Sequence, residues 1–151
     1  MPAKKVGRPA VPGTQTTFRF PPEHYDLIRS GADIQATYLS RSHPKGHQFS
    51  PSNALWLRGL IDYSYKNRKG IPPDVIKKAM LEVTGGGEEM TSVTLILPEE
   101  QRVMLRKFEC ACQALNWKVD LHRNAAINLM VKTHSQAFNE ALRLRPSPQH
   151  S

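Results

Sequence analysis

Four residues in the C-terminal half of the chain are of the types that bind zinc: Cys110, Cys112, His122 and His134. Structural zinc sites draw their ligands from closely spaced pairs such as Cys-x-x-Cys, and the sequence contains no such pair. Cys112 follows Phe108 by four residues and His134 precedes Phe138 by four, so both face the apolar side of an expected helix. We therefore expect packed thiols and a satisfied core or interface histidine instead of a metal site.

The sequence also lacks a recognisable residue set for catalysis. There is no Ser/His/Asp arrangement, and His24 and His43 have no identifiable partner. The three glycines at residues 85–87 are followed by Glu88 and Glu89, whose charges do not suit a phosphate-binding loop. We predict a protein that is not an enzyme and that uses no cofactor.

The net charge of +8, from 21 Lys and Arg against 13 Asp and Glu, favours a polyanionic partner such as nucleic acid or an acidic membrane surface. No apolar run reaches the roughly 18 residues that span a bilayer, and no signal-peptide pattern follows the basic start. Cys110 and Cys112 lie two residues apart in an expected helix, which is poor geometry for a disulfide. We expect a soluble cytoplasmic protein that does not enter a membrane.

Residues 1–14 hold three prolines, two glycines and no acidic residue, which predicts a flexible basic arm. Its charges, Lys4, Lys5 and Arg8, would contact phosphates. The Gly-Arg-Pro sequence at residues 7–9 resembles the centre of an AT-hook, whose arginine enters narrow minor grooves, although Val6 stands where the hook has an arginine. Both interpretations of the arm remain open.

A short pattern occurs twice in the chain. Residues 16–24 read TTFRFPPEH and residues 92–100 read SVTLILPEE, with Phe20 and Leu97 separated by 77 positions. In each copy apolar and polar residues alternate, as in a half-buried strand, and a proline and an acidic residue then open a helix. We interpret the chain as two copies of one small unit.

The helices follow from apolar spacing and capping residues. The first should run from the prolines to about Leu39, with Gly31 as a weak point, and a loop should cover residues 40–48. Ser50 should cap a second, central helix that contains Trp56 and is apolar on nearly all sides. A short connecting helix should lie within residues 71–83. In the second copy a stripe of Met104, Phe108, Ala111 and Leu115 predicts one helix, and Asp120 should cap the last.

Each unit alone is too small to bury a proper core, so the two should share one. We therefore divide the chain into a basic arm (1–14), a first unit (15–69), a connector with a short helix and a glycine-rich joint (70–91), a second unit (92–144) and a disordered tail (145–151).

The order strand, proline, helix, helix is that of the ribbon-helix-helix fold. The sequence FPPEHYDLIR at residues 20–29 resembles an Arc-type segment, and VTLILPEE at residues 93–100 is similar to the wider Arc/MetJ/CopG pattern. In that superfamily two chains each give one strand to an antiparallel ribbon that reads the DNA major groove. The tandem copies resemble the TraY-like arrangement, which implies a mostly α fold with a two-stranded β-ribbon formed as an intramolecular pseudodimer.

The resemblance implies that outward ribbon residues read bases, namely Gln15, Thr17, Arg19, Ser92, Thr94 and Ile96. Arg19 could be bidentate to a guanine, Gln15 could pair with adenine, and Ile96 could touch a thymine methyl. Ile96 stands where the family usually has a polar or basic residue, so the second strand should read bases less strongly. The two half-sites would differ, which predicts an asymmetric DNA site.

The start of the second helix is expected to contact phosphate through Ser50, Ser52 and Asn53. Together these features predict sequence-specific binding of double-stranded DNA, by a transcriptional repressor or a plasmid transfer or partition accessory protein, with possible higher-order assembly on DNA. Two alternatives stay open: an antitoxin-like protein-interaction module, and a nonspecific nucleic-acid binder that uses the basic arm.

Overall fold

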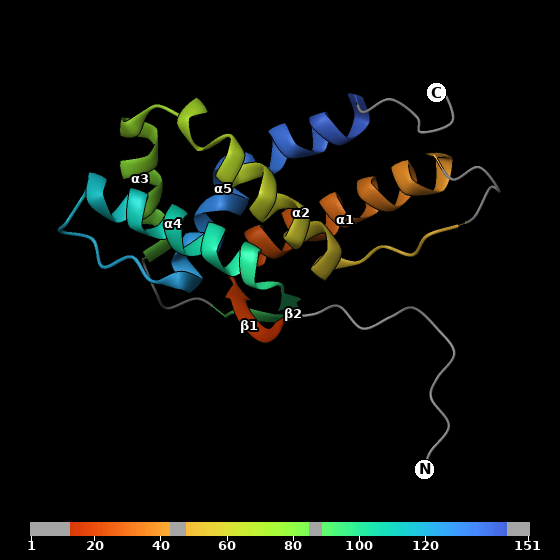
Figure 1. The fold of residues 1–151 in the computed structure, drawn as a ribbon, viewed down its shortest axis with the longest axis horizontal. Helices are drawn as coiled ribbons and strands as arrows, with labels where there is room; N and C mark the ends of the chain where they lie inside the picture. Colours follow the sequence, from red (N-terminus) through yellow and green to blue (C-terminus); the bar gives the residue numbers. More distant parts are fainter. Residues whose placement is uncertain (1–12, 43–47, 85–88, 145–151) are drawn as a thin grey trace, which may run out of the picture.

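The computed structural model describes residues 13–42, 48–84 and 89–144. The predictions for Lys4, Lys5 and Arg8, for the joint at residues 85–87 and for the tail lie outside this part of the chain. The described residues form a mostly helical fold with one two-stranded antiparallel sheet, as predicted (Figure 1). The elements in chain order are β1 Thr14–Phe20, α1 Pro22–Ser42, α2 Asn53–Lys66, the 3-10 helix η1 Arg68–Gly70, α3 Pro73–Thr84, β2 Thr91–Leu97, α4 Glu99–Leu115 and α5 Arg123–Leu144.

The two strands pair with each other although 70 residues of chain separate them, since β1 ends at Phe20 and β2 begins at Thr91. Thr14 lies opposite Leu97 and Phe20 lies opposite Thr91. The alternation that the sequence predicted is confirmed: one face of the ribbon is buried, and the other is exposed apart from the half-buried Ile96. The inward residues are Thr16, Phe18, Phe20, Val93, Leu95 and Leu97.

A proline lies between each strand and the helix that follows it. Pro21 and Pro98 follow the last strand residues, and the carbonyl oxygen of each accepts the first helical hydrogen bonds, from His24 and Tyr25 in α1 and from Gln101 and Arg102 in α4. Proline cannot continue a strand ladder because it has no N–H. The acidic residues in both first helical turns then favour the positive end of the helix dipole.

Two of the predicted helix caps are wrong by two residues. The side chain of Ser52, and not that of Ser50, caps α2 by accepting the Leu55 N–H at 3.1 Å. His122, and not Asp120, caps α5: its Nδ1 accepts the Ala125 N–H at 3.2 Å. In both places several residues are able to cap, and the tertiary position of the helix selects one of them.

The two halves of the chain share one apolar core, as expected. Its central helix is α5, which packs against α1, α2, α3 and α4 and buries every residue from 125 to 131. We predicted that α2 would be central; it buries Trp56, Leu57, Leu60 and Ile61 but leaves Leu55 exposed. Small residues such as Ala125 and Ala126 let other helices approach α5 closely, which apolar spacing alone does not reveal.

The expected stripe of α4 is confirmed in part: Phe108 is buried, and Met104 and Leu115 are partly buried against the core. Leu105, Phe108 and Cys112 are buried, whereas Ala111 is exposed. Gly31, which looked like a weak point of α1, is where the Trp56 ring crosses the helix, because a Cβ there would lie 2.2 Å from Trp56 Cε2. The glycine therefore permits a close helix contact.

The connecting helix α3 packs on the core through Ile76, Ala79 and Met80. Glu82 of this helix forms an ion pair with Lys132 of α5, with Glu82 Oε2 and Lys132 Nζ 2.5 Å apart. This interaction lowers the pKa of the Glu82 carboxyl. The connection between the two halves thus includes a docked helix. None of the helices in the described ranges is long and apolar enough to cross a membrane.

Candidate nucleic-acid interface

The structure brings the six predicted base-reading residues together on the outward face of the ribbon. They form three cross-strand pairs: Gln15 with Ile96, Thr17 with Thr94, and Arg19 with Ser92. Ile96 is half-buried and the other five are exposed. The Oγ1 atoms of Thr17 and Thr94 lie 2.8 Å apart, so a hydrogen bond joins the strands at the centre of this face.

Two asparagines of α5 hold the backbone of Arg19. Asn124 Oδ1 accepts the Arg19 N–H at 2.7 Å, and Asn124 Nδ2 donates to the Arg19 carbonyl oxygen at 3.1 Å. Asn128 Nδ2 donates to the same oxygen at 2.9 Å. The backbone at Arg19 is therefore fixed while its side chain stays exposed to solvent.

Asn128 also gives the buried His24 its partner. Asn128 Oδ1 lies 2.7 Å from His24 Nδ1, and because the amide nitrogen of Asn128 already donates, His24 must be the donor in this contact. This network was missed in the sequence. The available signal was two asparagines one helical turn apart, in a helix whose neighbouring residues are apolar.

Ser50, Ser52 and Asn53 lie together where α2 begins. Ser50 is exposed, and Asn53 is the first helical residue. The hydroxyl oxygen of Ser52 accepts the Leu55 N–H as the helix cap, so this residue has a structural role in addition to the predicted phosphate contact.

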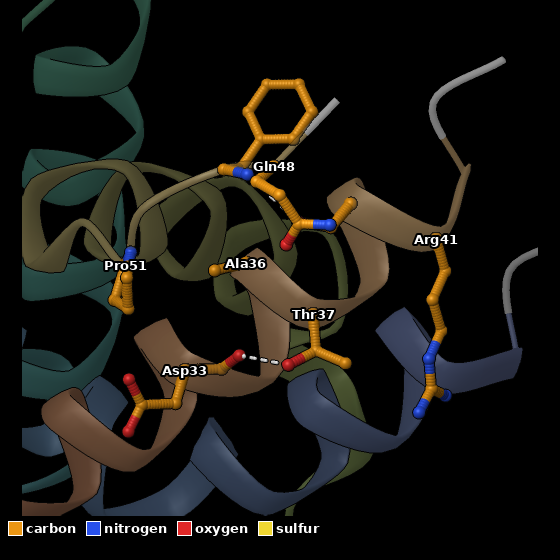
Figure 2. A pocket seen from close by; sticks show the side chains of 8 residues that line it. Asp33, Ala36, Thr37, Arg41, Gln48 and Pro51 are labelled. Carbon is orange, nitrogen blue, oxygen red and sulfur yellow. Dashed lines mark hydrogen bonds between the residues drawn. The ribbon is translucent and has the colours of Figure 1, made fainter. Parts of the chain in front are cut away.

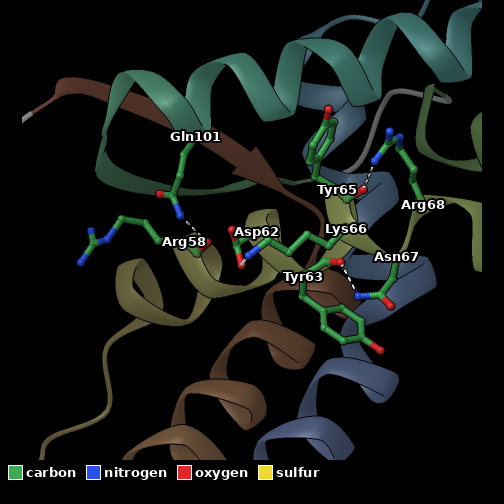
Figure 3. Close-up of polar contacts among 8 residues, drawn as sticks. All are labelled: Arg58, Asp62, Tyr63, Tyr65, Lys66, Asn67, Arg68 and Gln101. Atoms are coloured by element: carbon green, nitrogen blue, oxygen red, sulfur yellow. Dashed lines mark hydrogen bonds and ion pairs between the residues drawn. The ribbon is translucent and has the colours of Figure 1, made fainter.

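A second contact ties the start of α4 to α2 (Figure 3). Gln101 Nε2 donates to the carbonyl oxygen of Arg58 at 2.8 Å. Burial lowers the pKa of the Arg58 guanidinium. Near the C-terminal end of α2, Lys66 pairs with Asp62 at 3.0 Å. Arg68, the first residue of η1, lies over the Tyr65 ring at 4.2 Å.

A cavity of ≈ 590 Å³ lies near the C-terminal end of α1 (Figure 2). Its lining includes Asp33, Thr37 and Arg41, and the Thr37 hydroxyl donates to the Asp33 carbonyl oxygen at 3.0 Å. Among the described residues this lining carries one carboxylate, Asp33, and one guanidinium, Arg41, and it includes no histidine, lysine or cysteine.

The candidate zinc ligands are dispersed. In the described ranges no three His, Cys, Asp or Glu side chains gather to hold a metal ion. Cys110 is exposed, Cys112 is buried, both are free thiols, and burial raises the pKa of Cys112 to about 12.

His134 is buried as predicted, but it is not satisfied. Neither of its ring nitrogens has a hydrogen-bond partner among the described residues, and its ring meets Tyr63 edge-on with centroids 5.9 Å apart. Burial lowers the pKa of His134, and the backbone of Asn67 acts in the opposite direction.

Comparison of the chain with protein families, with curated proteins and with solved structures gave no match.

Proposed function

We propose that the chain is a tandem ribbon-helix-helix protein that binds double-stranded DNA sequence-specifically, with its β-ribbon in the major groove. The observation that carries the proposal is the outward face of the ribbon, where two distant segments of one chain place six potential base-reading side chains together. A two-stranded ribbon is one of the shapes that the major groove admits.

The pairing of β1 with β2 supports a single-chain pseudodimer. A two-stranded ribbon is marginal alone, and in ribbon-helix-helix proteins a second chain supplies the partner strand. Here the partner strand comes from the same chain, and both strands bury their apolar faces in one shared core.

Corresponding contacts in the two halves add a second line of support. Thr17 and Thr94 meet at the centre of the ribbon and are 77 positions apart. His24 and Gln101 have the same separation, and both reach across to the last helix of the opposite half, at Asn128 and Arg58. These relations support the proposal that a pseudo-twofold axis through the ribbon relates the two halves.

The chemistry of the exposed face fits base readout. Arg19 offers a bidentate donor pair for guanine, Gln15 an amide for adenine, and Ile96 an apolar contact for a thymine methyl. Because Arg19 lies opposite Ser92 and Gln15 opposite Ile96, the two ends of the ribbon differ, and an asymmetric DNA site follows. The net charge of +8 would strengthen binding to any DNA.

In a cell such a protein would act in the cytoplasm, as a transcriptional repressor or as an accessory protein of plasmid transfer or partition. Its cellular role would depend on where its DNA site lies.

The test begins with selection of duplexes from a random pool by the wild-type chain. Arg19→Ala should then cost about 1 to 3 kcal/mol of binding free energy on the selected duplex and relax its sequence preference, because a bidentate base contact is lost. Arg41→Ala is the matched control: it removes the same charge near the far end of α1, about 28 Å along the helix from Pro22. Equal losses on selected and random duplexes for Arg19→Ala would refute base reading by the ribbon.

A further inference from the structure

Three arginines from two helices surround a cavity of ≈ 490 Å³ between α4 and the start of α5. Arg102 and Arg106 lie one turn apart on α4, and Arg123 is the first residue of α5. Leu97 and Leu105 line the apolar part of the cavity, and Glu109 is its carboxylate. We call this the arginine pocket.

The charge of the arginine pocket is not neutralised within the described part of the chain. All three arginines are exposed. The ion pairs among the described residues are Lys66 with Asp62 and Lys132 with Glu82, and neither pair includes one of these arginines. Three guanidinium groups against one carboxylate leave a net charge of +2. Arg102 and Arg106 are like charges at i and i+4 on α4, and an anion bound between them would relieve their repulsion.

The arginine pocket adjoins the ribbon. The Arg123 guanidinium carbon lies 5.9 Å from the centre of the Phe18 ring, on the buried side of β1. The next residue, Asn124, bonds the backbone of Arg19 on the outer edge of the same strand. A duplex that received the ribbon in its major groove would therefore bring a strand of phosphates past this pocket, and guanidinium groups bind phosphate oxygens in bidentate geometry.

The corresponding place in the first half is not basic. The 77-position separation matches Arg102 with Tyr25, Arg106 with Arg29, and Cys110 with Asp33. The residues that cap the second helix of each half, Ser52 for α2 and His122 for α5, are 70 positions apart. At the same offset, Arg123 corresponds to Asn53. One arginine and one aspartate give this counterpart a net charge of zero.

We infer that the arginine pocket binds the phosphodiester backbone of DNA on one flank of the ribbon only, and that this one-sided contact helps to orient the protein on its site. The inference rests on the proposed function and adds to it a backbone-binding site that the sequence patterns did not indicate. The three residues come together only in the folded chain, because 17 positions separate Arg106 from Arg123.

The experiment compares Arg102→Gln/Arg106→Gln with Arg29→Gln, the counterpart on the opposite flank, on a duplex selected by the wild-type chain. Glutamine keeps a polar, unbranched side chain and a similar helix propensity while removing the charge. In the double variant the slope of log affinity against log salt should fall by about 2, because each lost phosphate contact lowers it by about 1. Between about 50 and 200 mM salt, a fourfold change, the wild-type affinity should then fall about 16-fold more than that of the double variant.

Arg29→Gln should leave the slope within about 0.5 of the wild-type value, since a neutral region makes no comparable contact. Phosphate ethylation interference should disappear on one flank of the duplex in the double variant. Equal salt slopes for the double variant and the wild type, with specific binding intact, would overturn this inference and leave the proposed function standing. Loss of interference on both flanks would overturn the one-sided contact. Absence of specific binding by the wild-type chain would overturn the proposed function and this inference with it.

Discussion

A disulfide across the centre of the ribbon offers a direct test of the single-chain pairing. Thr17→Cys/Thr94→Cys, in a Cys110→Ser background, is expected to form a bond within one chain. The backbone N–H and C=O of Arg19 bond outward to Asn124, so Arg19 occupies a non-hydrogen-bonded position of the ladder. Two residues away, Thr17 and Thr94 share that geometry, in which Cα atoms are about 4.5 Å apart and within the range that a disulfide spans.

The size of the effect follows from the length of chain enclosed. Thr17 and Thr94 are 77 positions apart. Closing a loop of this length lowers the entropy of the unfolded chain by an amount worth up to about 4.5 kcal/mol at 25 °C. For a chain of this size each kcal/mol corresponds to about 2 to 4 °C, so the melting temperature should rise by up to about 9 to 18 °C.

The assay is thermal melting with and without reductant, beside non-reducing electrophoresis of the oxidised protein. The oxidised variant should migrate as a single chain and lose its extra stability when reduced. Thr17→Cys alone, in the same background, controls for the substitution itself. A species of two chains linked through these positions at micromolar concentration would refute pairing within one chain, as would an oxidised variant that melts no higher than the reduced one.

Two further predictions concern the core. Gly31→Ala should destabilise the fold by about 3 kcal/mol in urea unfolding, because the new Cβ would displace the Trp56 ring and break the hydrogen bond from Trp56 Nε1 to Asn139 Oδ1. Overpacking and the unpartnered N–H cost about 2 kcal/mol each, and the higher helix propensity of alanine returns about 1 kcal/mol. Gly70→Ala, with no atom within 4 Å of the new Cβ, should change stability by no more than about 0.5 kcal/mol, and equal effects of the two substitutions would contradict this account. Because burial lowers the pKa of His134 in the folded chain, the unfolded chain binds the proton first, and wild-type stability should fall as pH drops below 6.5, by at most about 1.4 kcal/mol per pH unit. His134→Leu should remove this component of the pH dependence measured by urea unfolding between pH 7.5 and 5, and parallel curves for the two proteins would disprove it.

The parts of the fold that were predictable depend on local patterns. Alternating polarity placed Thr17 and Thr94 on the outward face, and the proline after each strand marked the start of a helix. The helix caps were less predictable, because Ser50 and Ser52 are equally able to cap and only the packed position of α2 selects Ser52.

The repeat spacing indicated the pairing of the two strands, but side-chain contacts between distant segments could not be read from spacing. Asn128 contacts Arg19 and His24 across more than 100 positions, and sequence separation carries no information about such a contact. Gly31 looked like a helix weakness because propensity is a local quantity, whereas the reason for glycine there is the ring of Trp56 from another helix.

The asparagine contacts at Arg19 have a consequence for association between copies of the chain. A two-stranded ribbon exposes unpaired N–H and C=O groups along both outer edges, and such edges can add strands from other molecules. On β1, Asn124 and Asn128 occupy the N–H and carbonyl of Arg19, so an incoming strand would meet amide side chains in place of open hydrogen-bonding groups. The same side chains that hold the ribbon in place therefore also protect one edge of it against aggregation through β-strand addition.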